Sequence, residues 1–188
     1  MSAALEALAR EASACVACEL SGTRTHVVFA SGPAAARLML VGEAPGAEED
    51  RTGTPFVGRS GALLDRVLSE VGLERAGIYV TSAVKCRPPG NRNPRPGELR
   101  ACERFLAGQL ALVRPSVVVC LGATAARSIL GSTATISSLR GRVHPLDGSS
   151  AEVLVTYHPA AGLRGGPSVV AKIREDLAAA RALLGAVA

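Results

Sequence analysis

Short, continuous apolar runs alternate with amphipathic segments along most of this chain, and this alternation limits its fold more than any other feature. Four runs are typical of strands that are covered on both faces of a sheet: "ARLMLVG" (36–42), "GIYVTS" (77–82), "VVVCLG" (117–122) and "EVLVTYHP" (152–159). The stretch "SGALLDRVLSEVG" has apolar residues at helical spacing, with Ser60 as the expected N-cap and Gly72 as the expected stop.

Further helices are predicted over residues 96–115, 123–131 and 168–185. Strands that alternate with helices predict an α/β fold, a three-layer α/β/α sandwich around a central, mostly parallel sheet of four strands. The 188 residues are 48% hydrophobic and contain no repeat or linker, so the whole chain (1–188) is expected to form a single domain.

The sequence predicts no membrane partner. No apolar run approaches the ~20 uncharged residues that a membrane span needs. The N-terminal stretch carries Glu6, Arg10 and Glu11 where a signal peptide would be apolar. We therefore expect a cytoplasmic protein.

Positive charge is concentrated in one segment of a chain whose formal net charge is +5. The basic residues between positions 85 and 104 are Lys85, Arg87, Arg92, Arg95, Arg100 and Arg104. Only Glu98 and Glu103 oppose them in that segment. This pattern fits a polyanionic partner, and it fits equally a solvated loop that leads into a helix.

The segments that follow the four strands contain most of the chemically informative residues. They are "GEAPGAEEDRTGTPFVGRSG", "SAVKCRPPGNRNPRPG", "GATAARS" and "HPAAGLRGGPS". In open α/β sheets, ligands bind beyond the carboxyl ends of the strands. We therefore expect these four segments to share one cleft.

Five cysteines occur in the chain, and four of them could hold a metal centre. Cys120 lies inside "VVVCLG", where it is expected to be a small buried hydrophobe. Cys15 and Cys18 form a C-x2-C turn, and Cys86 and Cys102 come from the arginine-rich loop and the helix after it. Four thiolates suit tetrahedral zinc or an iron-sulfur cluster, and unligated thiols are the third reading.

Two strand ends carry candidate binding residues. "GEAPGAEED" lacks the G-K-[ST] ending of a phosphate loop, so Glu43 either faces a substrate or belongs to a turn whose acids cap the next segment. Phe56 either belongs to the core or stacks on a flat base.

The last strand ends at "TYHPAAGLRGGP". His158 either forms a structural hydrogen bond or faces the cleft, and His144 in "GRVHP" is a weaker candidate. Leu163 and Arg164 lie among small residues and glycines, in a protrusion that could wedge into a duplex.

Together, "GEAPGAEED", "TGTPFVGRSGALLD", "YVTSAVKCRPPGNRNP", "PSVVVCLGATAA" and "YHPAAGLR" resemble the family 4, iron-sulfur-containing uracil-DNA glycosylases of bacteria and archaea. The resemblance runs from Cys15 to the last helix. It implies an α/β/α sandwich, hydrolysis of the N-glycosidic bond of uracil in single- or double-stranded DNA, and a monomeric enzyme. It also implies a 4Fe-4S cluster on Cys15, Cys18, Cys86 and Cys102, which selects iron-sulfur over zinc.

The resemblance implies roles for individual residues. Phe56 would stack on a flipped uracil, with Gly42, Ala44 and Ser82 also contacting the base. His158 would donate a hydrogen bond to uracil O2, and Glu43 would position the attacking water, with Glu49 and Asp50 as second choices. Contacts to DNA are expected from Ser60, Arg87, Arg92, Leu163 and Arg164.

One residue departs from the family pattern. Ser82 stands where the family usually has Asn, whose amide accepts from uracil N3-H and donates to O4. A hydroxyl is shorter and offers a single donor, so we expect weaker uracil binding or looser base choice. A catalytically weak or altered-specificity protein that binds DNA lesions is therefore the alternative function. A relative that bonds covalently to DNA is disfavoured, because no basic insertion follows Cys86 and all four cluster cysteines are kept.

Overall fold

The computed structural model describes residues 2–186 and has a five-stranded sheet at its centre, in the order β2-β1-β3-β5-β4. The four expected strands are β1 (Leu38–Gly42), β2 (Ile78–Ser82), β3 (Val117–Leu121) and β5 (Glu152–Thr156), and all pair in parallel. The predicted count of four strands was one too low. The extra strand, β4 (His144–Pro145), has only two residues and pairs antiparallel with β5, too short to leave a pattern in the sequence.

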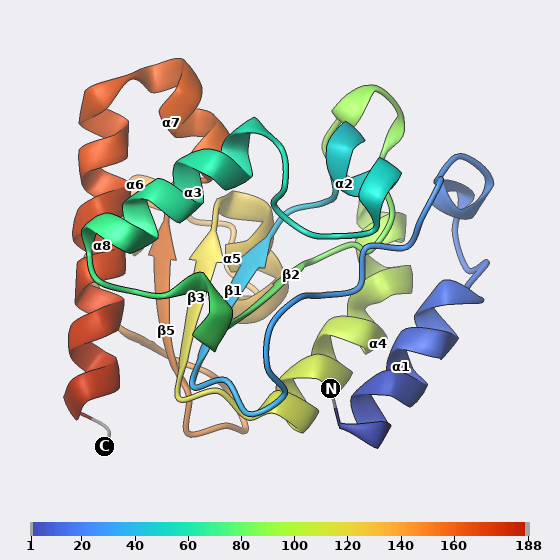
Figure 1. Ribbon diagram of the computed structural model, residues 1–188, viewed down its shortest axis with the longest axis horizontal. Helices are drawn as coiled ribbons and strands as arrows, with labels where there is room; N and C mark the ends of the chain where they lie inside the picture. The colour runs from blue at the N-terminus through green and yellow to red at the C-terminus, as the bar shows by residue number, and fades with distance from the viewer. Residues whose placement is uncertain (1, 187–188) are drawn as a thin grey trace.

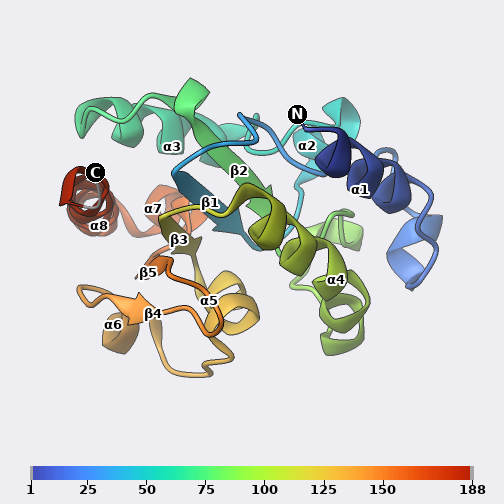
Figure 2. The same cartoon turned by 90° about the horizontal axis from the view of Figure 1, so that it is seen from below.

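Helices cover both faces of the sheet, which confirms the predicted sandwich (Figure 1). One layer contains α1 (Ala3–Ser13), α4 (Pro96–Val113) and α5 (Ala123–Leu130). The other contains α3 (Arg59–Glu70), α7 (Pro159–Gly165) and α8 (Pro167–Ala186). Figure 2 shows these layers from below, with α1 and α4 on one side of β1 and α3 and α8 on the other. Two short helices, α2 (Ala47–Thr52) and α6 (Ile136–Leu139), lie in the connections.

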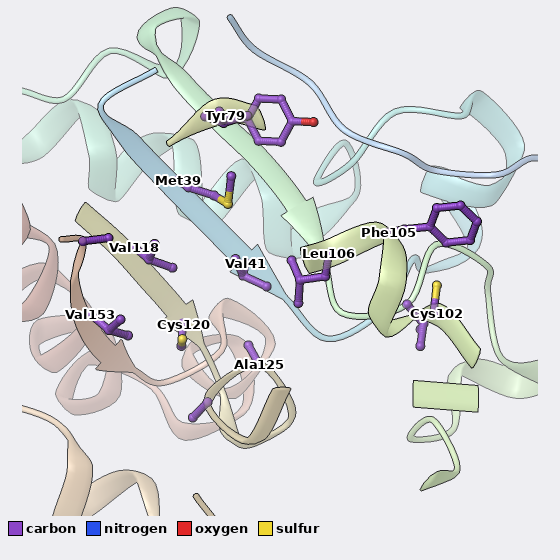
Figure 3. Packing of buried hydrophobic residues seen from close by; sticks show 14 of the residues in the cluster. Met39, Val41, Tyr79, Cys102, Phe105, Leu106, Val118, Cys120, Ala125 and Val153 are labelled. Atoms are coloured by element: carbon purple, nitrogen blue, oxygen red, sulfur yellow. The ribbon is translucent and has the colours of Figure 1, made fainter. Parts of the chain in front are cut away.

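Strand side chains divide between the two layers because successive residues point to opposite faces. Met39 and Val41 pack toward α4 and α5, as Figure 3 shows, whereas Leu38 and Leu40 pack toward α3 and α8. Cys120 is fully buried in the first of these clusters, as predicted, and burial raises the pKa of its thiol well above the usual range.

The start of α3 differs from the sequence expectation. The helix begins at Arg59 with Gly58 as its N-cap, so Ser60 is inside the first turn and does not cap it. Within the first turn, the backbone of Gly61 lies close to that of Phe56. A Cβ on Gly61 would be only 1.9 Å from the Phe56 carbonyl oxygen. At the other end, Gly72 has a φ of +71°, the left-handed conformation expected at a helix stop.

The N-terminal part of the chain crosses the open edge of the sheet. α1, which was not predicted, packs on α4. The segment after it runs along β2, where Ser31 forms a bridge with Val80 and the Val28 N–H donates to the Lys85 carbonyl. This path brings Cys15 and Cys18 close to Cys86 and Cys102.

In residues 2–186, no helix has the length and apolarity to cross a bilayer.

Candidate active site

A cavity of about 480 Å³ lies at the carboxyl ends of the parallel strands. Its lining comes from all four strand-end segments, so the predicted shared cleft is present. The predicted residues that line it are Glu43, Ala44, Glu49, Phe56, Ser60, Ser82, Arg92, His158 and Arg164. A groove of similar volume, about 510 Å³, lies between α4 and α5 and contains none of the predicted site residues.

Phe56 forms an aromatic wall of this cavity. It is 7% exposed and has a φ of +54°, an uncommon conformation for a bulky residue. Its ring lies against Gly42, where an added Cβ would come within 2.6 Å of the ring. Its ring centroid is 5.8 Å from that of His158. Because Gly42 has no side chain, the Phe56 ring can lie directly against the end of β1.

Glu49 holds the Phe56 loop in place. Its carboxylate accepts hydrogen bonds from the backbone N–H groups of Gly46, Val57 and Gly58, at 2.9 to 3.1 Å. The donor residues lie before and after Phe56 in the sequence. Their hydrogen bonds offset the conformational free energy that the left-handed Phe56 backbone costs. The arrangement favours a supporting role for Glu49 over contact with a reacting water.

Asp50 faces away from the cavity. It accepts a hydrogen bond from the Thr25 N–H at 2.9 Å and a longer one from the His26 N–H. The His26 ring in turn contacts the Asp50 carbonyl. Asp50 therefore ties α2 to the N-terminal segment, and Glu43 is left as the better placed carboxylate.

Glu43 has a partner that the sequence did not reveal. The hydroxyl of Thr124 donates a short hydrogen bond to Glu43 Oε2. Thr124 lies in the first turn of α5, just after Gly122, whose φ of +97° starts the helix beside His158. The segment "GATAARS" was expected at the cleft, but only the fold shows which of its residues reaches the carboxylate.

His158 is the N-cap of α7, and its ring has a defined orientation. Nδ1 accepts a hydrogen bond from the Ala160 N–H at 3.1 Å, so the proton of the neutral ring is on Nε2. Burial and, to a smaller extent, the positive charge of Arg164 lower the pKa of His158 to about 4, against the opposing charge of Glu49. At neutral pH the imidazole is therefore an uncharged hydrogen-bond donor.

Ser82 lies at the end of β2 beside Gly42, with which it is paired across the sheet. It is 3% exposed, and its Oγ is 3.2 Å from the point where a Gly42 Cβ would be. Thus its hydroxyl lies between the strand end and the Phe56 ring, at the floor of the cavity.

The arginine-rich loop is anchored by internal bonds. Arg92 forms two hydrogen bonds with the buried Glu98 carboxylate, at 2.9 and 2.5 Å, and lowers the pKa of that carboxyl. Glu98 also accepts from the Arg95 N–H at the start of α4. Arg92 therefore lines the cavity with its guanidinium already engaged, while Arg87 contacts Asn91 through Nε and keeps its terminal nitrogens for other partners.

Leu163 and Arg164 are exposed at the rim of the cavity. The sequence suggested a glycine-bracketed protrusion, and the structure shows instead the short helix α7. Arg164 lines the cavity, whereas its neighbour Leu163, which is 45% exposed, does not. His144 bonds to the Leu139 carbonyl in the β4 region, away from the cavity.

A model of the Uracil DNA glycosylase superfamily matches residues 29–178, which is most of the chain. The chain belongs to this superfamily. Curated relatives agree with the match. A type-4 uracil-DNA glycosylase of Archaeoglobus fulgidus is 42% identical over 165 residues, covering 85% of this chain and 83% of its own. One of Thermotoga maritima is 40% identical over 183 residues, covering 96% and 94%. A type-5 uracil-DNA glycosylase of Thermus thermophilus is 38% identical over 146 residues, covering 68% and 66%.

The resemblance to this family is thereby confirmed, and the fold agrees with it. Within this member of the uracil-DNA glycosylase superfamily, one basic residue lies where the sequence did not place it. Lys85 was counted with the arginine-rich loop, but it is only 1% exposed, and burial lowers the pKa of its ammonium to about 7 against the opposing charge of Cys102.

Cys15, Cys18, Cys86 and Cys102 line one small cavity of about 20 Å³. Arg24 donates to Cys86 Sγ at 3.3 Å and to the Cys15 carbonyl at 2.8 Å, and the Lys85 N–H donates to Cys102 Sγ at 3.3 Å. Burial raises the pKa of the Cys102 thiol to about 11 and also raises that of Cys86. Figure 3 shows Cys102 beside Phe105 on α4.

Two kinds of metal centre take four thiolates, a single tetrahedral ion and an iron-sulfur cluster. Among residues 2–186, no three candidate ligands converge closely enough for a single ion. A four-iron cluster takes one thiolate at each iron, so its cysteines surround a larger centre, and N–H donors to sulfur tune such clusters. Four thiols around one cavity, with N–H groups that donate to two of their sulfurs, are a donor set that fits such a cluster.

Proposed function

We propose that this protein removes uracil from DNA by hydrolysing its N-glycosidic bond and leaves an abasic site. The observation that carries the proposal is the joint placement of Phe56, neutral His158 and Glu43 around one strand-end cavity. Its support from sequence is the identity of 40–42% to curated type-4 uracil-DNA glycosylases over most of both chains.

The target nucleotide must first leave the duplex, because the cavity cannot reach a stacked base. Extrusion costs a few kcal/mol. Exposed Leu163 at the rim can fill the gap, and Arg164 beside it can hold a phosphate. Ser60 and Arg87 complete the contacts to the backbone, whereas we assign Arg92 to the shape of the loop.

Inside the cavity, the Phe56 ring stacks on the flat base. As the C1′–N1 bond breaks, its electron pair moves onto the uracil ring and the sugar becomes cation-like. The His158 Nε2–H donates to uracil O2 and stabilises the negative charge that develops there. Since the imidazole is neutral, it acts as a hydrogen-bond donor to the departing anion and keeps its Nε2 proton.

Water then attacks C1′ from the Glu43 side. The Glu43 carboxylate orients this water, accepts its proton and stabilises the cation-like sugar. Thr124 keeps the carboxylate in one orientation through its hydrogen bond to Oε2. Gly42 and Ala44, on either side of Glu43, have small side chains or none, which leaves room for the base beside the carboxylate.

We propose that Cys15, Cys18, Cys86 and Cys102 hold a 4Fe-4S cluster. When bound, the cluster supplies four metal–thiolate bonds that tie the N-terminal segment to the loop after β2. Arg24 and the Lys85 N–H orient two of these sulfurs. Cysteines that hold such a cluster must stay unpaired, as they do in a reducing compartment, and we therefore propose a cytoplasmic location. One chain supplies Glu43, Phe56, Ser82 and His158 together, so the cavity needs no residue of a second copy, and we also propose a monomer.

The test is incubation of the iron-replete protein with single- and double-stranded oligonucleotides that contain one uracil, followed by alkaline cleavage at abasic sites. We expect cleavage at the uracil position. Binding without cleavage would establish the alternative function, a lesion-binding protein of the same fold. A preparation that is free of iron after anaerobic purification would overturn the cluster assignment and leave the cavity assignment standing.

A further inference from the structure

The strand that delivers Ser82 to the cavity is at the open edge of the sheet. Its inner side is paired with β1, and the Ala83 N–H beyond its end donates to the Gly42 carbonyl at 2.9 Å. Its outer side is paired with the chain at only one position, Val80, which forms a bridge with Ser31. Further along this outward side is the Ser82 carbonyl, at the end of the strand that lines the cavity.

The side chain of Lys85 covers this carbonyl. Its Nζ donates to the Ser82 carbonyl oxygen at 2.5 Å and to Thr81 Oγ1 at 2.8 Å. Thr81 in turn donates toward the Phe29 carbonyl and Gln109 on α4. All these side chains are buried, so the bonds are shielded from water and each is costly to lose.

The main chain of Lys85 is fixed on both sides. Its N–H donates to Cys102 Sγ at 3.3 Å, and its carbonyl accepts from the Val28 N–H at 2.8 Å. A side chain that starts from a fixed backbone and ends on two fixed acceptors has little freedom. It can therefore hold the strand end to which it binds.

We propose that Lys85 is a positioning residue for base recognition, because it holds the Ser82 carbonyl and thereby the Ser82 hydroxyl at the floor of the cavity. This inference rests on the proposed function for the identity of the base. Lys85 is not among the residues that line the cavity. Its effect on base binding passes through the end of β2.

The test compares Lys85→Met, which keeps the length of the side chain and removes its donors, with Lys172→Met. Lys172 is the only other lysine of the chain, is exposed on α8 and lies outside the cavity. The first measurement is hydrogen exchange of a peptide that covers residues 79–84. The second is affinity for a duplex with 2′-fluoro-2′-deoxyuridine, which resists hydrolysis, relative to a duplex with an abasic-site analogue.

We expect Lys85→Met to speed exchange in residues 79–84 and to lower the relative affinity for the fluorinated uridine about 10-fold. Its iron content and its affinity for the abasic analogue should match those of Lys172→Met. If Lys85→Met does not fold, Lys85→Gln, which keeps a neutral donor, carries the same test with a smaller expected change.

Unchanged exchange and unchanged relative affinity in a folded Lys85 variant would overturn the inference. A wild-type protein without preference for the fluorinated uridine would instead contradict the proposed function. Faster exchange at 79–84 would even then support the role of Lys85 at the strand end, so the two failures are distinguishable.

Discussion

At the residue scale, the neutral state of His158 links stability to pH. The pKa of this side chain is about 4 in the folded protein, against 6.5 for the ordinary residue. Between these values the unfolded chain binds a proton that the folded chain does not. The free energy of unfolding should therefore fall as the pH drops from about 6.5 to about 4.

The expected result is a smaller pH dependence in His158→Asn. Urea unfolding at pH 7 and pH 4.5 should show a difference in free energy for the wild type that shrinks in the variant. His144→Asn, a substitution remote from the cavity, is the control and should leave that difference in place. An equal pH dependence in His158→Asn and the wild type would contradict the assignment of a neutral, buried imidazole.

Thr124 provides a second test at this scale, because it contacts Glu43 and not the base. Thr124→Val removes the hydroxyl and keeps the shape of the side chain. We expect kcat to fall about 10-fold while KM changes little, since a single hydrogen bond to a charged group is lost. Thr124→Ser keeps the hydroxyl and should retain most of the activity. Equal losses in both variants would show that packing, and not the hydrogen bond, is what matters.

We propose Ser82 as the residue that sets base choice. Ser82→Asn adds an amide that can accept from uracil N3-H and donate to O4. We expect faster turnover on uracil and slower turnover on cytosine opposite guanine, a change of about 1 to 3 kcal/mol at that contact. Single-turnover rates on both substrates measure it. Unchanged rates on both would show that Ser82 does not set the selectivity.

At the element scale, the loop between β2 and α4 depends on Glu98. This buried carboxylate binds Arg92 and caps the first turn of α4 through the Arg95 N–H. Glu98→Gln weakens both interactions and should loosen the loop. We expect cleavage by trypsin after Arg92, which Glu98 holds, to become about 10-fold faster.

Glu103→Gln is the matched control, since Glu103 is exposed on the same helix. Its cleavage rate should equal that of the wild type. If both variants are cleaved equally fast, the loop does not depend on the buried carboxylate.

Elements with a strong pattern could be predicted from the sequence, and their contacts could not. The four parallel strands and the helices α3, α4, α5 and α8 follow from continuous apolar runs and helical spacing, and their observed bounds lie close to the expected ones. Ser60 was predicted as a cap on propensity alone. The helix begins instead behind Gly58, which has no capping side chain, and the Glu49 carboxylate fixes the Val57 and Gly58 N–H groups just before it.

Lys85 and Thr124 show what a pattern cannot reveal. A lysine in an arginine-rich segment is usually exposed, and its burial here depends on a loop that folds back onto β2. Thr124 meets Glu43 from 81 positions further along the chain, a contact that only the parallel sheet creates. Neither the burial of Lys85 nor the contact between Thr124 and Glu43 leaves a pattern in the neighbouring sequence from which it could be predicted.

At the scale of the whole molecule, the sheet brings base recognition and chemistry to one edge. β1 contributes Gly42 and leads to Glu43, β2 contributes Ser82, and β5 leads to His158. Parallel pairing places all three strand ends together, because each strand ends at the same level of the sheet. The cysteine cavity lies behind β2, where the N-terminal segment and α4 meet. The cysteine cavity and the strand-end cavity are thus separate and are connected through β2.

The most direct measurement is the amount of free uracil released from a uracil-containing duplex, quantified by mass spectrometry together with the state of the DNA strand. The proposed function predicts one free uracil for each abasic site, with the strand intact until alkali is added and no protein bound to it. Release of no uracil would contradict the proposal. Strand cleavage before alkali or a covalent protein–DNA product would contradict simple hydrolysis by water at the Glu43 side of the cavity.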